Sequence, residues 1–364
     1  MNAVNETTIR QALQAVIDPN TGQDFVTGKC IRGLSVAGAD VQLEVELGYP
    51  AQTQFAALAA LLRQAVQAVP GVGAVDVQVR SRVTKHAVQR GVELLPGVKN
   101  IVAVASGKGG VGKSTTAVNL ALALAAEGAK VGVLDAVIYG PSVPTMLGVT
   151  GRPVSNDGQT MEPLENHGLQ IMSIGLLVAQ DEAMIWRGPM AIQALDQLLR
   201  QSNWKDLDYL IIDMPPGTGD IQLSLAQKVP LTGAVIVTTP QDIALMDVRK
   251  GIKMFEKVGV PILGVVENMA VHVCSQCGHA EHIFGFEGGK RLAEQYGVAY
   301  LGALPLALPI REHADAGKPT VVAAPDSEVA GLYGAVARKV AVAVAGKAKE
   351  YSTKFPTITI SKNT

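Results

Sequence analysis

A glycine-rich run between a short apolar stretch and a helical pattern has the composition of a phosphate-binding loop. Gly107, Gly112, Lys113 and Ser114 satisfy the spacing G-x-x-x-x-G-K-[ST]. In such a loop, backbone N–H groups surround an anion, the following helix points its positive end at it, and the lysine reaches the outer phosphates while the serine binds Mg²⁺. The alternative is a glycine-rich turn before an ordinary helix. The residues expected to bind MgATP are Gly107, Lys108, Gly109, Gly110, Val111, Gly112, Lys113, Ser114 and Thr115.

A second lysine, Lys108, lies inside the same glycine turn. Lys113 already serves the phosphates of its own site, and Lys108 cannot easily reach them at the same time. In a face-to-face dimer Lys108 would instead reach the nucleotide of the partner, as an arginine finger does. We therefore predict a homodimer in which Lys108 and Lys113 are catalytic cations.

Two later segments have the character of strand ends at a nucleotide site. The apolar run Tyr209–Asp213 ends in a carboxylate, which suits a second Mg²⁺ ligand, although a strand-end aspartate is often only a helix cap. The turn after it contains Gly217, which we expect to sense the γ-phosphate. Asn268 follows another apolar run, where it is either a nucleotide-site residue or an ordinary turn-forming asparagine.

The chain contains three cysteines, Cys30, Cys274 and Cys277, which cannot all pair with one another. Cys274 and Cys277 have the C-x-x-C spacing of metal ligands, but they are only half of a Cys₄ set, and a symmetric dimer would supply four thiols. Within one chain, His279 or His282 would complete a zinc site, and an incidental pair is the third possibility. Cys30 is either a reactive thiol or a small buried hydrophobe.

Composition limits the classes of function. The chain has 364 residues, 48% of them apolar and only 4% aromatic, with a net charge of −1. This balance gives no overall attraction for nucleic acid or anionic membranes. The polar start lacks an apolar segment, and no run approaches about 18 uninterrupted apolar residues, so we expect a cytoplasmic protein with no membrane and no nucleic-acid partner.

The pattern of apolar runs predicts two domains. Residues 1–79 read as a small α+β domain, 80–98 as a linker, 99–348 as a P-loop ATPase domain, and 349–364 as an unassigned tail. Most strands of the large domain are continuous Val/Ile/Leu runs, which predict an α/β fold with a mostly parallel sheet and helices on both faces. The expected strands there are Ile101–Ala105, Val131–Leu134, Leu169–Ile174, Tyr209–Ile212, Ala234–Thr238, Ile262–Val266 and Tyr300–Leu304.

The loop with two lysines resembles the deviant phosphate-loop family of nitrogenase iron protein, partition ATPases and Mrp/ApbC-type iron–sulfur carriers. Partition ATPases lack the C-x-x-C motif, and residues 18–34 resemble an iron–sulfur assembly domain often fused ahead of Mrp-type ATPases. The segments similar to the Mrp/ApbC carriers are Val133–Gly148, Ile211–Asp220, Thr238–Ile252, Gly264–Cys274 and Leu304–Glu312.

The resemblance implies a [4Fe-4S] cluster held between Cys274 and Cys277 of two subunits. The cluster would come from a donor scaffold and go to apo iron–sulfur client proteins, with ATP binding and hydrolysis as the switch. It also implies that Asn268 reads the adenine base. The alternatives are a partition-type ATPase switch that acts on a membrane or DNA surface, and a zinc-stapled nucleotide-binding scaffold.

At one position the chain departs from this family. Relatives usually have D-x-D-I-Y-G-P-S where this sequence has Asp135 through Ser142, with Val137 in place of the second aspartate. In relatives that aspartate helps to polarise the attacking water, and valine cannot accept a proton. Asp135 remains the candidate catalytic carboxylate, and we expect normal MgATP binding with slow hydrolysis. The alternative is that hydrolysis is slow throughout the family and Val137 is tolerated.

Overall fold

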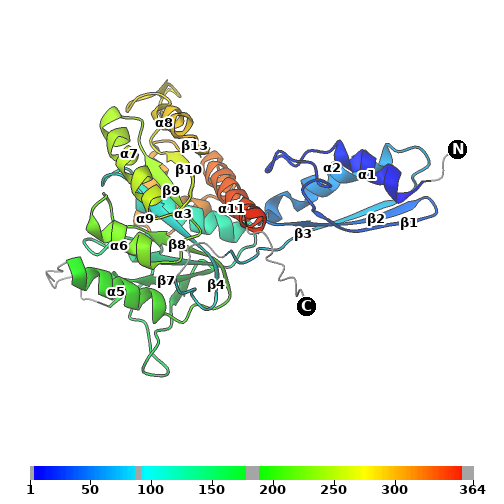
Figure 1. The fold of residues 1–364 in the computed structure, drawn as a ribbon. Coiled ribbons are helices and arrows are strands. Elements are labelled where there is room, and N and C mark those ends of the chain that lie inside the picture. The colour runs from blue at the N-terminus through cyan, green and yellow to red at the C-terminus, as the bar shows by residue number, and fades with distance from the viewer. Residues whose placement is uncertain (1–3, 87–91, 178–187, 355–364) are drawn as a thin grey trace, which may run out of the picture.

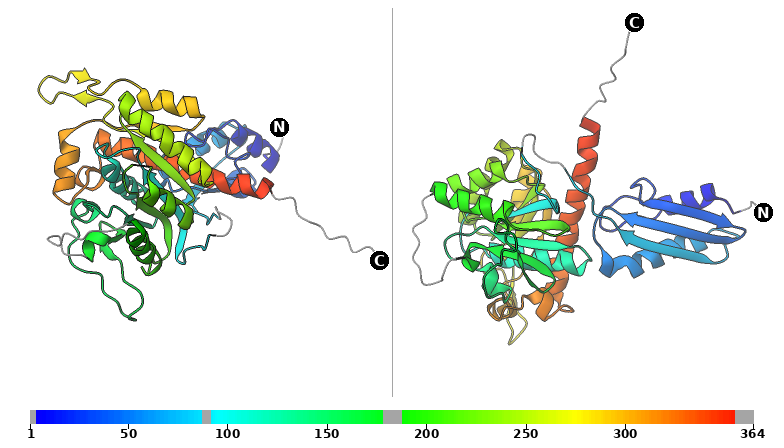
Figure 2. Two further views of the ribbon diagram at one scale, coloured as in Figure 1. Left: turned by 60° about the vertical axis from the view of Figure 1, so that its left-hand side comes forward. Right: turned by 90° about the horizontal axis from the view of Figure 1, so that it is seen from below.

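Figure 1 shows the fold in a computed structural model, which describes residues 4–86, 92–177 and 188–354, with side chains as far as residue 347. A small N-terminal domain lies beside a larger α/β domain, and the long helix α11 (Glu328–Lys354) lies at the junction of the two (Figure 2). This is the two-part organisation that the sequence predicts.

The N-terminal domain is a three-stranded sheet with two helices on one face. Strand β2 pairs antiparallel with β1 and parallel with β3. Inward-facing residues of β2 alternate with exposed ones, because one face of the sheet packs on the helices and the other meets solvent. The elements are α1 (Glu6–Gln14), β1 (Ile31–Ala37), β2 (Asp40–Leu47), η1 (Gln52–Gln54), α2 (Phe55–Gln67) and β3 (Val75–Ser81).

The large domain is built on an eight-stranded sheet in the order β13-β10-β9-β4-β8-β5-β7-β6. All neighbouring pairs are parallel except β6 with β7. The seven predicted strands are confirmed. The three-residue strand β6 was not predicted, because it is too short to show periodicity. The strands are β4 (Val98–Ala105), β5 (Val131–Asp135), β6 (Leu164–Asn166), β7 (Leu169–Ser173), β8 (Leu207–Asp213), β9 (Gly233–Thr238), β10 (Ile262–Glu267) and β13 (Tyr300–Ala303).

Helices cover both faces of this sheet, as predicted. Val102 and Val104 of β4 belong to a core shared with α3 and α11, while Ile101 and Ala103 of the same strand belong to the core on the opposite face. The strands are therefore apolar on both sides. The main helices are α3 (Lys113–Ala126), α5 (Gly188–Arg200), α6 (Asp220–Lys228), α7 (Asp242–Lys257) and α8 (Gly288–Tyr296).

The large domain also contains several short helices and strands. The hairpin of β11 and β12 is a separate two-stranded sheet that projects beyond β10. The remaining elements are α4 (Val143–Met146), η2 (Ile174–Leu176), β11 (His272–Val273), β12 (Ala280–Glu281), α9 (Leu308–Asp315) and α10 (Thr320–Ala323).

Helix α11 is longer than the sequence predicts. It continues to Lys354, past the predicted domain limit at 348, so part of the predicted tail is helical, and residues 355–364 lie outside the described residues. By length and composition alone its segment Glu328–Lys347 would be able to cross a membrane, although Arg338 and Lys339 interrupt its apolar run. One face of α11, however, including Tyr333 and Val340, is buried in the core against α3. This is the environment of a core helix.

The two domains meet at the end of helix α3. Glu127, which follows the last residue of α3, is 3% exposed and accepts hydrogen bonds from the Thr53 backbone N–H at 3.0 Å and hydroxyl at 2.8 Å. Arg338 of α11 also donates to the Glu127 carboxylate, and the Gln52 N–H donates to its carbonyl oxygen at 3.1 Å. One buried carboxylate therefore joins the N-terminal domain, α3 and α11.

We expect Glu127→Ala to lower the free energy of unfolding by about 3 kcal/mol, because the largely buried Arg338 guanidinium would lose its anionic partner. Chemical denaturation of the full chain measures the change. Glu127→Gln, which keeps an acceptor for Thr53 and removes only the charge, should cost less. A loss below about 1 kcal/mol for Glu127→Ala, the range of exposed ion pairs, would contradict this account.

Candidate nucleotide and metal sites

The predicted phosphate loop connects the central strand β4 to helix α3. Gly110 and Gly112 have φ of +81° and +79°, the left-handed region that glycine adopts without strain. Gly107 has a different requirement: a Cβ there would lie 2.5 Å from the backbone carbon of Asp247, because α7 packs against the start of the loop. The three glycines thus let the loop turn tightly beneath α7 and around one cavity.

That cavity has a volume of about 230 Å³ and lies at the carboxyl end of β4. Seven of the nine loop residues predicted to bind nucleotide line it, and Gly107 and Val111 do not. Residues that the motif alone did not indicate also line it, chiefly from the segment after β5. The lining residues are Ser106, Lys108, Gly109, Gly110, Gly112, Lys113, Ser114, Thr115, Val137, Gly140, Ser142, Met146 and Pro216.

Lys113 and Asp213 form a buried ion pair at the wall of the cavity. Val104 of β4 is the register partner of Asp213 at the end of β8, which brings the carboxylate to the start of α3. The Lys113 Nζ donates to Asp213 Oδ1 and lies 3.2 Å from the Ser114 hydroxyl. Burial raises the pKa of Asp213, and Lys113 opposes this effect.

The second carboxylate oxygen of Asp213 is buried and has no hydrogen-bond partner among the described residues. A buried anionic oxygen without a hydrogen bond is unfavourable, and a bound divalent cation would stabilise its negative charge. The Ser114 hydroxyl is the neighbouring oxygen donor. Asp213 and Ser114 therefore fit the predicted Mg²⁺ site, and the glycine cradle fits the phosphates.

Asp135 is positioned differently from the prediction. It is fully buried and not among the residues lining the cavity. Its carboxylate accepts the backbone N–H groups of Val137 at 3.0 Å and Val143 at 3.2 Å, and the Ser173 hydroxyl at 3.1 Å. Burial, and then the charge of Asp213, raise the pKa of Asp135 to about 7. In this structure Asp135 shapes the turn that carries the Val137 side chain to the cavity.

The other predicted nucleotide residues surround the loop. Asn268 is buried and donates from Nδ2 to the Val111 carbonyl at 2.9 Å, so it supports the loop from β10 and does not line the cavity. Gly217 has φ of +95° in the turn after β8, where its neighbour Pro216 lines the cavity. Lys108 lines the cavity, and its carbonyl accepts the Ser106 hydroxyl at 2.9 Å.

Cys274 and Cys277 lie in the turn between β11 and β12. The Cys274 N–H donates to the His279 carbonyl at 2.9 Å, and the Gly278 N–H donates to the Cys274 carbonyl at 2.8 Å, which closes a tight loop around both thiols. Cys274 is half-buried and Cys277 is exposed. Hydrogen bonds from the backbone of Cys277 and then of Gln276 lower the pKa of Cys274. A lowered thiol pKa favours the thiolate that binds metals.

The two histidines proposed for a zinc site do not join these thiols. His282 Nδ1 is 2.7 Å from the Ala270 carbonyl, and its ring packs edge-on against Phe286 at a centroid distance of 4.7 Å. His279 lies 3.6 Å from the Glu281 carboxylate. In residues 4–86, 92–177 and 188–347, no group of three or more His, Cys, Asp or Glu side chains is placed to hold a metal ion. One chain thus offers two thiol ligands.

Comparison with known proteins identifies the families that the two domains match. Residues 97–341 match the family described as NUBPL iron-transfer P-loop NTPase, and residues 6–79 match the family described as iron-sulfur cluster assembly protein. The iron-sulfur cluster carrier protein of Escherichia coli K12 is 51% identical over 352 residues, 94% of this chain and 95% of that protein. The carrier protein of Pseudomonas fragi is 59% identical over 275 residues, 75% of this chain and 96% of that protein.

Among solved structures, an ADP-bound nucleotide-binding protein from Archaeoglobus fulgidus, described with cobalt, is similar with a TM-score of 0.55 and 37% identity. The match covers 61% of this chain and 88% of that protein. The family matches fall on the two domains that the structure shows, and the larger one contains both the phosphate loop and the paired cysteines. The chain belongs to the family of NUBPL-type iron-transfer P-loop NTPases.

Proposed function

We propose that this protein is an ATP-hydrolysing carrier that binds a [4Fe-4S] cluster as cargo and transfers it to apo-proteins. The observation that carries the proposal is the exposed turn with two thiols and no third ligand in the described part of the chain. A [4Fe-4S] cluster takes four thiolates, which two copies related by symmetry would supply through Cys274 and Cys277. The names of the relatives support the same cargo.

The nucleotide site would act as the switch. Backbone N–H groups of the glycine loop and the Lys113 ammonium would bind the phosphates, and Ser114 and Asp213 would hold Mg²⁺, which offsets phosphate charge when bound. Lys108 lines the same cavity, and in a face-to-face dimer it would reach the partner's nucleotide. ATP binding would thereby favour one arrangement of the two subunits over another.

The proposed partners are those that cluster uptake and cluster transfer require. A donor scaffold supplies the cluster, a second copy of the chain completes its site, and apo iron–sulfur proteins receive it. We place the protein in the cytoplasm and propose no nucleic-acid or membrane partner, which is consistent with a net charge of −1. The domain limits proposed are 1–79, 80–98, 99–348 and 349–364.

Anaerobic reconstitution with iron and sulfide tests the cargo directly. We expect visible absorption from the cluster and about four iron atoms per dimer in the parent protein. Either Cys274→Ala or Cys277→Ala should abolish the cluster and weaken the dimer, because two of the four thiolates are lost from each dimer. Iron, sulfide and zinc analysis with size-exclusion chromatography gives both measurements.

Cys30→Ala is the matched control, and it should keep full cluster and dimer. Full cluster occupancy in either Cys274→Ala or Cys277→Ala would disprove the bridging site. Zinc without sulfide in the reconstituted parent protein would point to the zinc-stapled scaffold, and a dimer that forms with ATP but binds no metal would point to a partition-type switch.

A further inference from the structure

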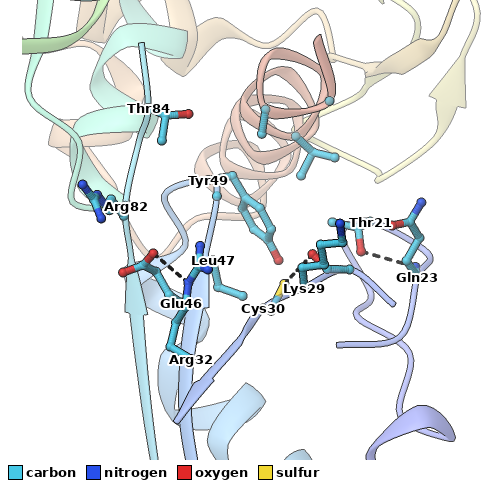
Figure 3. A pocket seen from close by; sticks show the side chains of 15 residues that line it. Thr21, Gln23, Lys29, Cys30, Arg32, Glu46, Leu47, Tyr49, Arg82 and Thr84 are labelled. Atoms are coloured by element: carbon cyan, nitrogen blue, oxygen red, sulfur yellow. Dashed lines mark hydrogen bonds and ion pairs between the residues drawn. The ribbon is translucent and has the colours of Figure 1, made fainter. Parts of the chain in front are cut away.

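A further cavity lies between the N-terminal domain and helix α11, away from both sites above. Its volume is about 580 Å³, within the range of about 300 to 1,000 Å³ typical of small-molecule sites. Figure 3 shows Cys30 and Tyr49 beneath α11, with Glu46 and Arg82 toward the other side of the cavity. The lining residues are Thr21, Gln23, Gly28, Lys29, Cys30, Arg32, Glu46, Leu47, Gly48, Tyr49, Arg82, Thr84, Val342, Ala345 and Gly346.

The backbone fixes the thiol in the wall of this cavity. Lys29 has φ of +56°, and this left-handed residue turns the chain just before Cys30, the residue that precedes β1. The Glu46 N–H donates to the Cys30 carbonyl at 2.8 Å, while the thiol lies 3.6 Å from the Gly28 carbonyl. Cys30 is half-buried and not in a disulfide. The thiol is thus accessible from a cavity and held by β-structure.

The charge of the lining is positive. Arg32, Lys29 and Arg82 face a single acid, Glu46, and Glu46 is already paired with Arg32 and with Arg80, each at 3.1 Å. Lys29 and Arg82 form no ion pair within the described residues. Two cations of the lining therefore remain available to an anion that enters the cavity. Cationic neighbours also favour the thiolate, which is the nucleophilic form.

The roof of the cavity leaves room for a ligand because α11 contributes small residues there. A Cβ on Gly48 would lie 3.7 Å from the Ala345 side chain, so the two domains approach closely at the rim of the cavity. A Cβ on Gly346 would meet nothing within 4 Å. The open volume is bounded by both domains, and an occupant would contact both.

We propose that this cavity binds small anionic disulfides and that Cys30 exchanges with them, a site independent of the proposed cluster cargo. The Cys30 thiolate attacks one sulfur of the ligand, a new S–S bond joins Cys30 to that half, and the old S–S bond breaks. The other half leaves as a thiolate and takes up a proton. Lys29 and Arg82 bind the carboxylates of the ligand. Transient mixed disulfides of this kind are the redox chemistry found in reducing compartments.

The test uses the full chain with Cys274→Ser and Cys277→Ser, which leaves Cys30 as the one cysteine of the protein. Glutathione disulfide is the anionic probe and cystamine the cationic one, and mass spectrometry follows the mixed disulfide. Each rate is divided by the rate of the same probe with 2-mercaptoethanol, an uncharged small thiol, which removes the intrinsic reactivity of the probes. At low salt we expect glutathione disulfide to be favoured about tenfold, roughly threefold from each of two nearby cations.

Two pairs of matched variants locate the effect. Lys29→Gln and Arg82→Gln should each reduce the preference about threefold, whereas Lys253→Gln, an exposed lysine on α7, should leave it unchanged. Gly346→Leu should slow exchange by filling the cavity, whereas Gly331→Leu in the same helix should not. Equal normalised rates for the two probes, or a preference that survives both Lys29→Gln and Arg82→Gln, would overturn the proposal.

Discussion

Lys113→Ala should weaken ATP binding by about 100-fold or more, because it removes the one ammonium group that is held at the cavity wall by a buried carboxylate. Charge-assisted hydrogen bonds to phosphate in a confined site contribute about 1.5 to 3 kcal/mol, and two phosphates would share this lysine. Titration with a fluorescent ATP analogue measures the affinity. Because Asp213 also loses its ion-pair partner in this variant, a thermal melt without nucleotide is needed to check that the variant is folded.

Lys108→Ala is the comparison that separates binding from assembly. Lys108 lines the cavity but makes no ion pair with the described residues, so its loss should change ATP affinity by less than about threefold. ATP-dependent association of two chains, and the hydrolysis that depends on it, should be lost. Equal ATP affinity in the parent protein and Lys113→Ala would remove the basis of the nucleotide-site assignment.

Val137→Asp should raise the rate of ATP hydrolysis by tenfold or more with little change in affinity. The Val137 side chain lines the nucleotide cavity, while its backbone N–H is held by Asp135 at 3.0 Å, so a side chain at this position is fixed at the reaction site. Positioned acid–base groups contribute about 10² to 10⁴-fold to rates, and valine has no such group. Single-turnover hydrolysis of bound ATP compares the two proteins without the complication of product release.

Val137→Asn is the control for Val137→Asp, because it has nearly the same shape but a far weaker proton acceptor. It should remain as slow as the parent protein. If Val137→Asp is also no faster, the missing carboxylate does not limit hydrolysis, and slow turnover is a property of the rest of the site. Asp135 offers no substitute in this structure, because the residues that line the cavity do not include it.

The parts of the site that were predictable are those encoded by short-range spacing. The glycine loop with Lys113, the carboxylate that ends β8 and the paired cysteines each lie in one continuous segment. The sequence also indicated two-sided burial, since a strand such as β4 is apolar at successive positions. These features require no knowledge of which strands are neighbours.

The remaining features depend on contacts between distant segments. Lys113 and Asp213 are 100 positions apart and meet because β4 and β8 are adjacent in the sheet. Strand order also sets Asp135 directly opposite Asp213, whose charge adds to the effect of burial in raising the pKa of Asp135. The cavity at Cys30 requires α11, more than 300 residues further along the chain. Residue types alone do not specify any of these pairings.

Helix α3 connects the nucleotide site to the N-terminal domain as a single rigid rod. Its 14 residues span roughly 21 Å, from Lys113 at the phosphates to the Glu127 carboxylate that holds Thr53. A helix transmits a tilt at one end to the other with little loss, because its backbone hydrogen bonds resist bending. If phosphate binding displaced the first turn of α3, the Glu127–Thr53 contact at the other end of the helix would pass that displacement to the N-terminal domain, whose position would then depend on whether the ATP site is filled.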